Sequence, residues 1–338
     1  MQRCLELATK GLGQVAPNPM VGCVIVCNGE VVAEGYHQQY GQAHAEPNAI
    51  KQVSDDILQQ STLYVTLEPC CHYGKTPPCA DLIISKRIPR VIVGNLDSNP
   101  LVAGKGIQKL KEAGVEVEYG VLDKECKELN KRFFTFHEKK RPYVILKWAQ
   151  TNDGFISKLP LPSNQKDNWI TSTESKHLVH TWRSQEQAIL IGYKTALADN
   201  PLLSTRLVSG ANPIRLVIDE KLQLPDTLNV FNDESKTIVF NTLRDDEKNN
   251  IVYVKINFKN STNDILNYCF TKNIASIIVE GGTKTIHQFI ETNHWDEARV
   301  FVNPHLNFKT GVSAPELSLV NKVAISVGSD LLFTFKNV

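Results

Sequence analysis

The sequence predicts two α/β domains joined by a charged connector. The length of 338 residues suits two domains better than one. Short β-branched stretches alternate with helix-forming stretches on both sides of residues 123–142, as in layered α/β domains. The connector is itself helical in pattern and ends in the charged run 138–142. We therefore expect one domain over residues 1–122, the connector over 123–142, and a second domain over 143–338.

In the first half, two apolar stretches flank Asn28-Gly29, a dipeptide typical of tight hairpin turns. Residues 1–8 resemble one amphipathic helical segment. The other elements expected there are a helix at 46–60, a strand at 63–67, a helix from 78 or 79 to 86, a strand at 90–95, a helix at 106–113 and a strand at 115–119.

In the second half, the same reading predicts mostly strands. They are expected at 143–149, 188–192, 214–219, 237–241, 274–280, 298–302 and 331–336. Helices are expected at 172–185 and at Thr285, after the Gly281-Gly282 turn. The polar stretches 158–168 and 241–264 are predicted as loops, the second with room for a short strand at 251–254.

Composition excludes several classes of protein. With 37 basic and 36 acidic residues the net charge is +1, which gives no electrostatic case for binding DNA, RNA or a membrane surface. No apolar run approaches the roughly 18 residues of a membrane span, and the amino terminus lacks a signal-peptide pattern. We therefore expect a cytoplasmic protein, in which the eight cysteines form a metal site and reduced core thiols instead of disulfides.

A zinc site that activates water is predicted by three residues with ligand chemistry. His44, Cys70 and Cys79 offer one imidazole and two thiolates, which leaves a fourth position for water. Bound zinc lowers the pKa of that water, and Glu46, two residues beyond the imidazole, is placed to carry its proton to a leaving amine. The alternative is a closed structural zinc in which Cys71 or His72 is the fourth ligand.

The order His-x-Glu followed by Pro-Cys is similar to that of the zinc deaminases that act on bases and nucleosides. Those enzymes usually continue Pro-Cys-x-x-Cys, whereas here Tyr73 stands at that second position. The longer spacing, together with the motifs around it, resembles the bifunctional deaminase/reductase (RibD) family of riboflavin biosynthesis. The motifs are Pro17-Asn18-Pro19, Gly35-x-His37, His44-Ala45-Glu46, Leu67-Glu68-Pro69-Cys70, Thr76-Pro77-Pro78-Cys79, Asp97-x-Asn99-Pro100 and Gly104-x-Gly106. Lys75 and Pro47 depart from the family pattern.

This resemblance implies a cytidine-deaminase-like three-layer domain, followed by an α/β domain similar to dihydrofolate reductase. It implies Zn²⁺ and NADPH as cofactors, and phosphoribosylaminopyrimidines as substrates. In the first domain it implies that Asn18 lies near the pyrimidine, while His72 and Lys75 line the entrance. His72 as a loop hydrogen bonder and Lys75 as a solvated surface residue remain alternatives.

For the second domain, a Rossmann fingerprint is absent from the sequence, since Gly104-x-Gly106 lacks the third glycine. Gly281-Gly282 after a strand offers backbone N–H groups to phosphate, or else a simple tight turn. The resemblance implies that NADPH lies near Ala149, Trp169, Thr195, Asp199, Gly281 and Gly282. It implies that the ribose phosphate lies near Lys147, Arg183, Leu203, Arg206 and Glu280. Arg183 and Arg206 suit a bidentate phosphate clamp, the alternative being surface salt bridges.

The resemblance thus implies a deaminase that acts on 2,5-diamino-6-(5-phosphoribosylamino)pyrimidin-4(3H)-one, followed by a reductase that converts the ribosyl group of the product to ribityl. The resemblance also implies a homodimer or homotetramer. Two competing hypotheses are a nucleic-acid-editing deaminase with a carboxy-terminal binding module, and a structural-zinc scaffold without activity.

Overall fold

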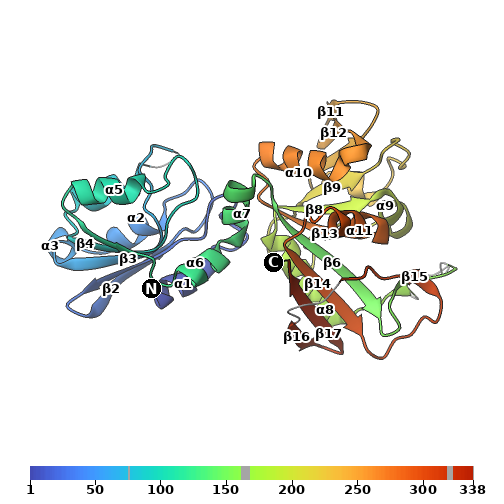
Figure 1. Cartoon of the computed structure of the whole chain (residues 1–338), viewed down its shortest axis with the longest axis horizontal. Coiled ribbons are helices and arrows are strands. Elements are labelled where there is room, and N and C mark those ends of the chain that lie inside the picture. Colours follow the sequence, from blue (N-terminus) through green and yellow to red (C-terminus); the bar gives the residue numbers. More distant parts are fainter. Residues whose placement is uncertain (75–76, 161–167, 318–322, 338) are drawn as a thin grey trace. The chain divides into compact units, whose positions relative to one another are not determined.

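The computed structural model describes residues 1–74, 77–160, 168–317 and 323–337. The chain divides into two compact units, Met1–Lys140 and Arg141–Val338. Each unit is built around its own sheet (Figure 1). Most of the segment 123–142 falls within the first unit.

The first unit has a five-stranded sheet in the order β2-β1-β3-β4-β5. Its strands are β1 (Gly22–Cys27), β2 (Glu30–Tyr36), β3 (Ser61–Leu67), β4 (Arg90–Asn95) and β5 (Glu116–Tyr119). Its helices are α1 (Gln2–Thr9), α2 (Ala45–Ile50), α3 (Asp55–Leu58), α4 (Cys79–Ser85), α5 (Lys105–Glu112), α6 (Asp123–Leu129) and α7 (Lys131–Lys139).

Alternation along the central strands explains the three layers of this unit. Cys23 and Ile25 of β1 pack into the larger core with residues of α2, α4 and α5. Val24, between them, packs on the opposite face against Cys4 and Leu7 of α1. Because successive strand residues point to opposite faces, one apolar strand supports helices on both sides (Figure 1).

Two expected helices are broken in the structure. The helix predicted at 46–60 is divided into α2 and α3, because Ser54 takes an extended conformation just before Asp55 and Asp56 start a new helix. The helical segment 123–140 is divided at Asn130, whose buried side chain accepts from Met20 N at 2.8 Å and donates to Met20 O at 2.9 Å. That pairing anchors α6 and α7 to the loop after α1.

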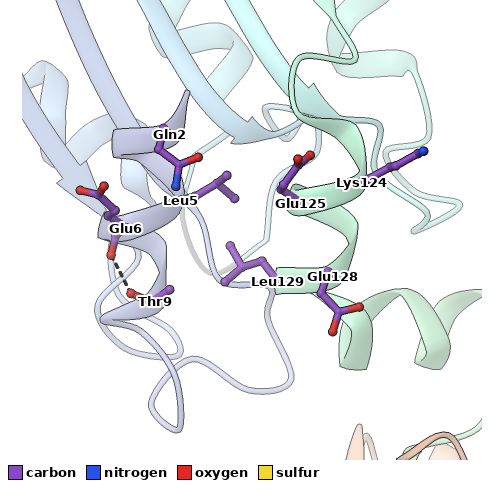
Figure 2. Close-up of a pocket in the computed structure, with 8 residues that line it drawn as sticks. All are labelled: Gln2, Leu5, Glu6, Thr9, Lys124, Glu125, Glu128 and Leu129. Carbon is purple, nitrogen blue, oxygen red and sulfur yellow. Dashed lines mark hydrogen bonds between the residues drawn. The ribbon is translucent and has the colours of Figure 1, made fainter. Parts of the chain in front are cut away.

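A shallow pocket of about 570 Å³ lies between α1 and α6. Figure 2 shows side chains from both helices around it. It is lined by Gln2, Leu5, Glu6, Thr9, Lys124, Glu125, Glu128 and Leu129. None of these is a predicted site residue, so we do not assign the chemistry to this pocket.

The second unit has a ten-stranded sheet in the order β11-β12-β10-β9-β8-β13-β6-β14-β17-β16, and a two-stranded sheet of β15 and β7. The strands are β6 (Tyr143–Thr151), β7 (Phe155–Lys158), β8 (Ala188–Gly192), β9 (Ile214–Ile218), β10 (Thr237–Asn241), β11 (Asp246–Lys248), β12 (Ile251–Lys255), β13 (Ser276–Glu280), β14 (Glu297–Asn303), β15 (Gly311–Ser313), β16 (Val323–Val327) and β17 (Asp330–Lys336). The helices are α8 (Thr173–Gln185), α9 (Tyr193–Asp199), α10 (Ser261–Thr271) and α11 (Thr283–Glu291), with short 3₁₀ turns at Asn229–Phe231 and Phe258–Asn260.

The seven neighbouring strands β12, β10, β9, β8, β13, β6 and β14 run parallel. Helices cover both faces of this part of the sheet. Residues of α10 and α11 pack in one core, with Leu146 and Val279 from the sheet. Residues of α8 pack on the other face, with Ile145 and Ile278. Within the predicted loop 241–264, the short strand expected at 251–254 is confirmed as β12, whereas β11 and the start of α10 were not expected.

Candidate active sites

Three predicted metal ligands converge in the first unit. His44 precedes α2, Cys70 lies in the loop after β3, and Cys79 is the first residue of α4. Their ligand atoms all lie within 4.8 Å of one another. His44 Nδ1 is 3.5 Å from Cys70 Sγ and 3.3 Å from Cys79 Sγ. The donor set of one imidazole and two thiols, at this spacing, fits zinc.

The local charges favour a metal ligand at Cys70. The hydrogen bond from the Cys79 thiol, together with those from His44 and the Cys79 backbone, lowers the pKa of Cys70 to about 4. The Cys79 N–H lies 3.3 Å from Cys70 Sγ, at the amino-terminal end of a helix, where a thiolate is stabilised. The same interaction with Cys70 raises the pKa of Cys79. The two thiols therefore share one negative charge, and a divalent cation would release the remaining proton.

Glu46 lies close to the ligands in sequence, as the second residue of α2. It is only 3% exposed. Burial, and secondarily the charge of Cys70, raises the pKa of Glu46 to about 7. A carboxyl group with such a pKa is suited both to accepting a proton and to returning it near neutral pH.

In the second unit, three predicted substrate residues form one buried ion cluster. Lys147 and Glu280 are register partners on neighbouring parallel strands, with Nζ 3.9 Å from Oε2. Arg183 of α8 binds Glu280 in bidentate geometry, at 3.1 Å for Nε and 2.7 Å for Nη2. Burial opposes ionisation of Glu280, but the charges of Arg183 and Lys147 outweigh it and lower its pKa to about 2.

The structure pairs Arg183 with a carboxylate, while Arg206 is exposed. The two-arginine phosphate clamp therefore stays a prediction. Leu203 lies nearby in sequence, buried and in the left-handed backbone region with φ of 53°.

Three predicted cofactor residues are brought together at the end of β13. Gly281 and Gly282 both have positive φ, at 118° and 63°, just before α11. A Cβ added to Gly281 would lie 2.6 Å from Cγ2 of Thr195, and one on Gly282 would lie 3.2 Å from its Oγ1. The glycines are thus required by backbone conformation and by the close approach of α9.

The other predicted cofactor residues are spread over neighbouring elements. Ala149 is half-buried in β6, and Asp199 is exposed at the end of α9. Trp169 is 55% exposed, and Lys176 Nζ lies 4.9 Å from the centre of its ring. A large exposed aromatic ring of this kind is suited to stacking on a planar ligand.

Comparison with known proteins identifies both halves. A family model described as the cytidine and deoxycytidylate deaminase zinc-binding region matches residues 1–95, and one described as the RibD C-terminal domain matches residues 142–307. The riboflavin biosynthesis protein RibD of Aquifex aeolicus is 39% identical over 99% of this chain and 97% of its own length. The chain belongs to the RibD family.

Other RibD proteins match at least 90% of the chain. RibD of Actinobacillus pleuropneumoniae is 40% identical over 90% of this chain and 83% of its own. The crystal structure of a diaminohydroxyphosphoribosylaminopyrimidine deaminase/5-amino-6-(5-phosphoribosylamino)uracil reductase from Thermotoga maritima covers 100% of this chain and 97% of its own, with a TM-score of 0.88 and 36% identity. Acinetobacter baumannii RibD covers 99% and 97%, with a TM-score of 0.89 and 31% identity.

The predicted fold class and function are thereby confirmed. The chain is a RibD-type bifunctional deaminase/reductase of riboflavin biosynthesis, with a zinc-binding deaminase domain followed by an NADPH-dependent reductase domain. The nucleic-acid-editing alternative is not favoured, because the RibD relatives match in both halves. Within the part of the chain that the structure describes, every helix is too short or too polar to cross a membrane.

The predicted pyrimidine contacts of the RibD deaminase domain are only partly described. Asn18 Nδ2 lies 3.1 Å from His37 Nε2. His72 is half-buried, and its Nδ1 is buried without a hydrogen-bond partner among residues the structure describes. Lys75 lies outside the described residues.

Sequence reasoning missed one residue that organises this site. The buried carboxylate of Glu68, two residues before Cys70, accepts from Asp97 N at 3.2 Å and Gly104 N at 2.9 Å through Oε2. Through Oε1 it accepts from Gly106 N at 2.8 Å and Ile107 N at 3.2 Å. A Cβ on Gly106 would lie 2.0 Å from Pro69 O, so this glycine serves close packing. A charged residue directly after an apolar strand, two positions before a metal ligand, was the available signal.

Proposed function

We propose that the first unit deaminates 2,5-diamino-6-(5-phosphoribosylamino)pyrimidin-4(3H)-one, and that the second reduces the ribosyl side chain of the resulting 5-amino-6-(5-phosphoribosylamino)uracil. The observation that carries the deaminase assignment is the convergence of His44, Cys70 and Cys79 beside a buried carboxyl group. The similarity of the whole chain to the Thermotoga maritima protein, whose name includes both activities, supports the choice of substrates.

In this proposal His44, Cys70 and Cys79 hold the zinc ion. Bound there, the ion supplies Lewis acidity toward water. Glu46 takes a proton from the attacking water at its carboxylate and delivers it to the departing amine. A C–O bond forms at the amino-bearing carbon, the C–N bond breaks, and ammonia leaves. Its burial keeps bulk water from competing for that proton, and its raised pKa lies close to neutral pH. Asn18, His72 and Lys75 contact the substrate around this centre.

For the reductase, we propose that Gly281, Gly282, Thr195, Asp199, Ala149 and Trp169 bind NADPH, which supplies the hydride. The close approach of Thr195 to both glycines supports one continuous surface at the start of α11. Lys147, Arg183, Leu203, Arg206 and Glu280 are the proposed substrate residues. The ion cluster holds Glu280 as a carboxylate, which can accept hydrogen bonds from ribose hydroxyl groups.

The test is a Glu46→Gln variant incubated with the diaminopyrimidine phosphate, with and without NADPH, and analysed by mass. We expect loss of ammonia release with zinc content retained, while reduction of separately supplied uracil intermediate continues. The proposal is contradicted if Glu46→Gln still releases ammonia at the wild-type rate, as a structural-zinc scaffold with chemistry elsewhere would require.

We also propose a homodimer or homotetramer in the cytoplasm, without a nucleic-acid partner. Family resemblance suggests the assembly, and near-neutral charge argues against nucleic acid. Light scattering on the purified chain tests the assembly, and a single-chain mass would contradict it. The functional domain limits 1–122 and 143–338 remain proposals, tested by limited proteolysis.

A further inference from the structure

His37 lies just after β2 and faces the metal cluster without being one of its ligands. It is 2% exposed. Its ring packs edge-on against the His44 ring, with centroids 5.3 Å apart. Its backbone N–H donates to Val21 O at 2.9 Å, which fixes the backbone position from which the side chain projects. A polar ring this deeply buried needs defined hydrogen bonds at both nitrogens.

Both ring nitrogens of His37 have such bonds. Nδ1 lies 3.1 Å from Ala43 O, and since a carbonyl oxygen only accepts, Nδ1 carries the proton. Nε2 lies 3.1 Å from Asn18 Nδ2. Because an amide nitrogen only donates, Nε2 is the acceptor in this bond and carries no proton.

This chain of bonds decides how the Asn18 amide is turned. If Nε2 carried the proton, the amide would present its oxygen to the ring. With Nε2 as acceptor, the NH₂ end faces His37, and the carbonyl oxygen is left for another partner. No hydrogen bond to that oxygen is made by the residues described here, so it remains available to a ligand.

We propose that His37 is a positioning residue for the deaminase: it fixes the tautomer-dependent orientation of the Asn18 amide, which recognises the pyrimidine. This inference rests on the proposed function, in which Asn18 contacts the substrate. His37 acts through Asn18 and takes no proton from the substrate.

The matched test compares His37→Gln with His37→Met. Glutamine can place an acceptor oxygen where Nε2 stood, while methionine has a similar length and no such acceptor. We expect His37→Met to lower kcat/KM for deamination by about 10- to 100-fold, mainly through KM, as a displaced binding group does. His37→Gln should restore most of this loss.

The same pair is then made in an Asn18→Ala background. If His37 acts through Asn18, His37→Met causes no further loss there, because the two effects are not additive. Equal losses in both backgrounds, or a Gln variant as poor as the Met variant, would overturn the inference. The zinc content of the His37 variants must stay at the wild-type level. Loss of zinc would instead mean that His37 supports the metal site through its contact with His44.

Reductase activity of the same preparations serves as the folding control, because that site lies in the other unit. Failure of the proposed function is recognised separately. In that case the wild-type chain releases no ammonia from the diaminopyrimidine phosphate, and no variant comparison is needed.

Discussion

Replacement of Glu68 should destabilise the first unit far more than the second. Its two carboxylate oxygens accept four backbone N–H groups, from Asp97, Gly104, Gly106 and Ile107, at 2.8 to 3.2 Å. Each buried donor left without an acceptor costs about 1–3 kcal/mol. With partial relaxation, we expect Glu68→Ala to lower the free energy of unfolding of this unit by about 4 kcal/mol.

Glu68→Gln is the matched control. It keeps the shape and one acceptor oxygen, but it turns an NH₂ group toward two of the four donors. Whichever oxygen is replaced, two N–H groups lose their acceptor, because each oxygen serves two. We therefore expect about half the loss, roughly 2 kcal/mol.

The assay follows from where the tryptophans lie. All four, Trp148, Trp169, Trp182 and Trp295, belong to the second unit. Urea unfolding followed by tryptophan fluorescence thus reports the second unit, while far-ultraviolet circular dichroism reports both. We expect an earlier transition in circular dichroism alone. An unchanged circular dichroism curve, or an equal shift in fluorescence, would refute the reasoning.

Two further predictions concern the reductase unit. Gly281→Ala should impair reduction and raise the KM for NADPH while deamination is unchanged. The reason is that a Cβ at this position would lie 2.6 Å from Thr195, and that φ is 118°. Steady-state assays of both activities check this, and unaltered reduction would count against it. Because the pKa of Glu280 is lowered from 4.5 to about 2, its contribution to stability is complete above pH ~4.5 and is lost as pH falls toward 2, by roughly 3 kcal/mol. Acid unfolding followed by tryptophan fluorescence should show this slope in the wild type, and an equally steep slope in Glu280→Gln would contradict the assignment.

The sequence was most informative where local signals agree. Asn28-Gly29 between two apolar stretches correctly predicted the hairpin of β1 and β2. The alternation of strands and helices correctly predicted layered α/β units. His44, Cys70 and Cys79 carry their ligand chemistry in the side chain itself, so their types and order were enough to propose a metal site.

The sequence was least informative where a distant partner decides the structure. Asn130 interrupts a helical pattern because its side chain binds the backbone of Met20, which is 110 residues away. The Glu68 carboxylate accepts hydrogen bonds from four backbone N–H groups that lie 29 to 39 residues downstream. Arg183 and Glu280 are 97 residues apart, so their pairing could not be read from spacing. Such contacts depend on the tertiary fold and leave no periodic signal.

The anchoring of Asn130 has a consequence for anyone dividing this enzyme. A fragment cut at residue 122 would lack Asn130, so the backbone N–H and C=O of Met20 would lose this hydrogen-bond partner, two positions from Asn18. It would also uncover Leu67, which packs with Phe133 and Phe134 just ahead of Glu68 and Cys70. Anyone expressing the amino-terminal enzyme by itself should therefore keep the chain through Lys140, because α7 packs against the end of the strand that leads to the zinc ligand Cys70.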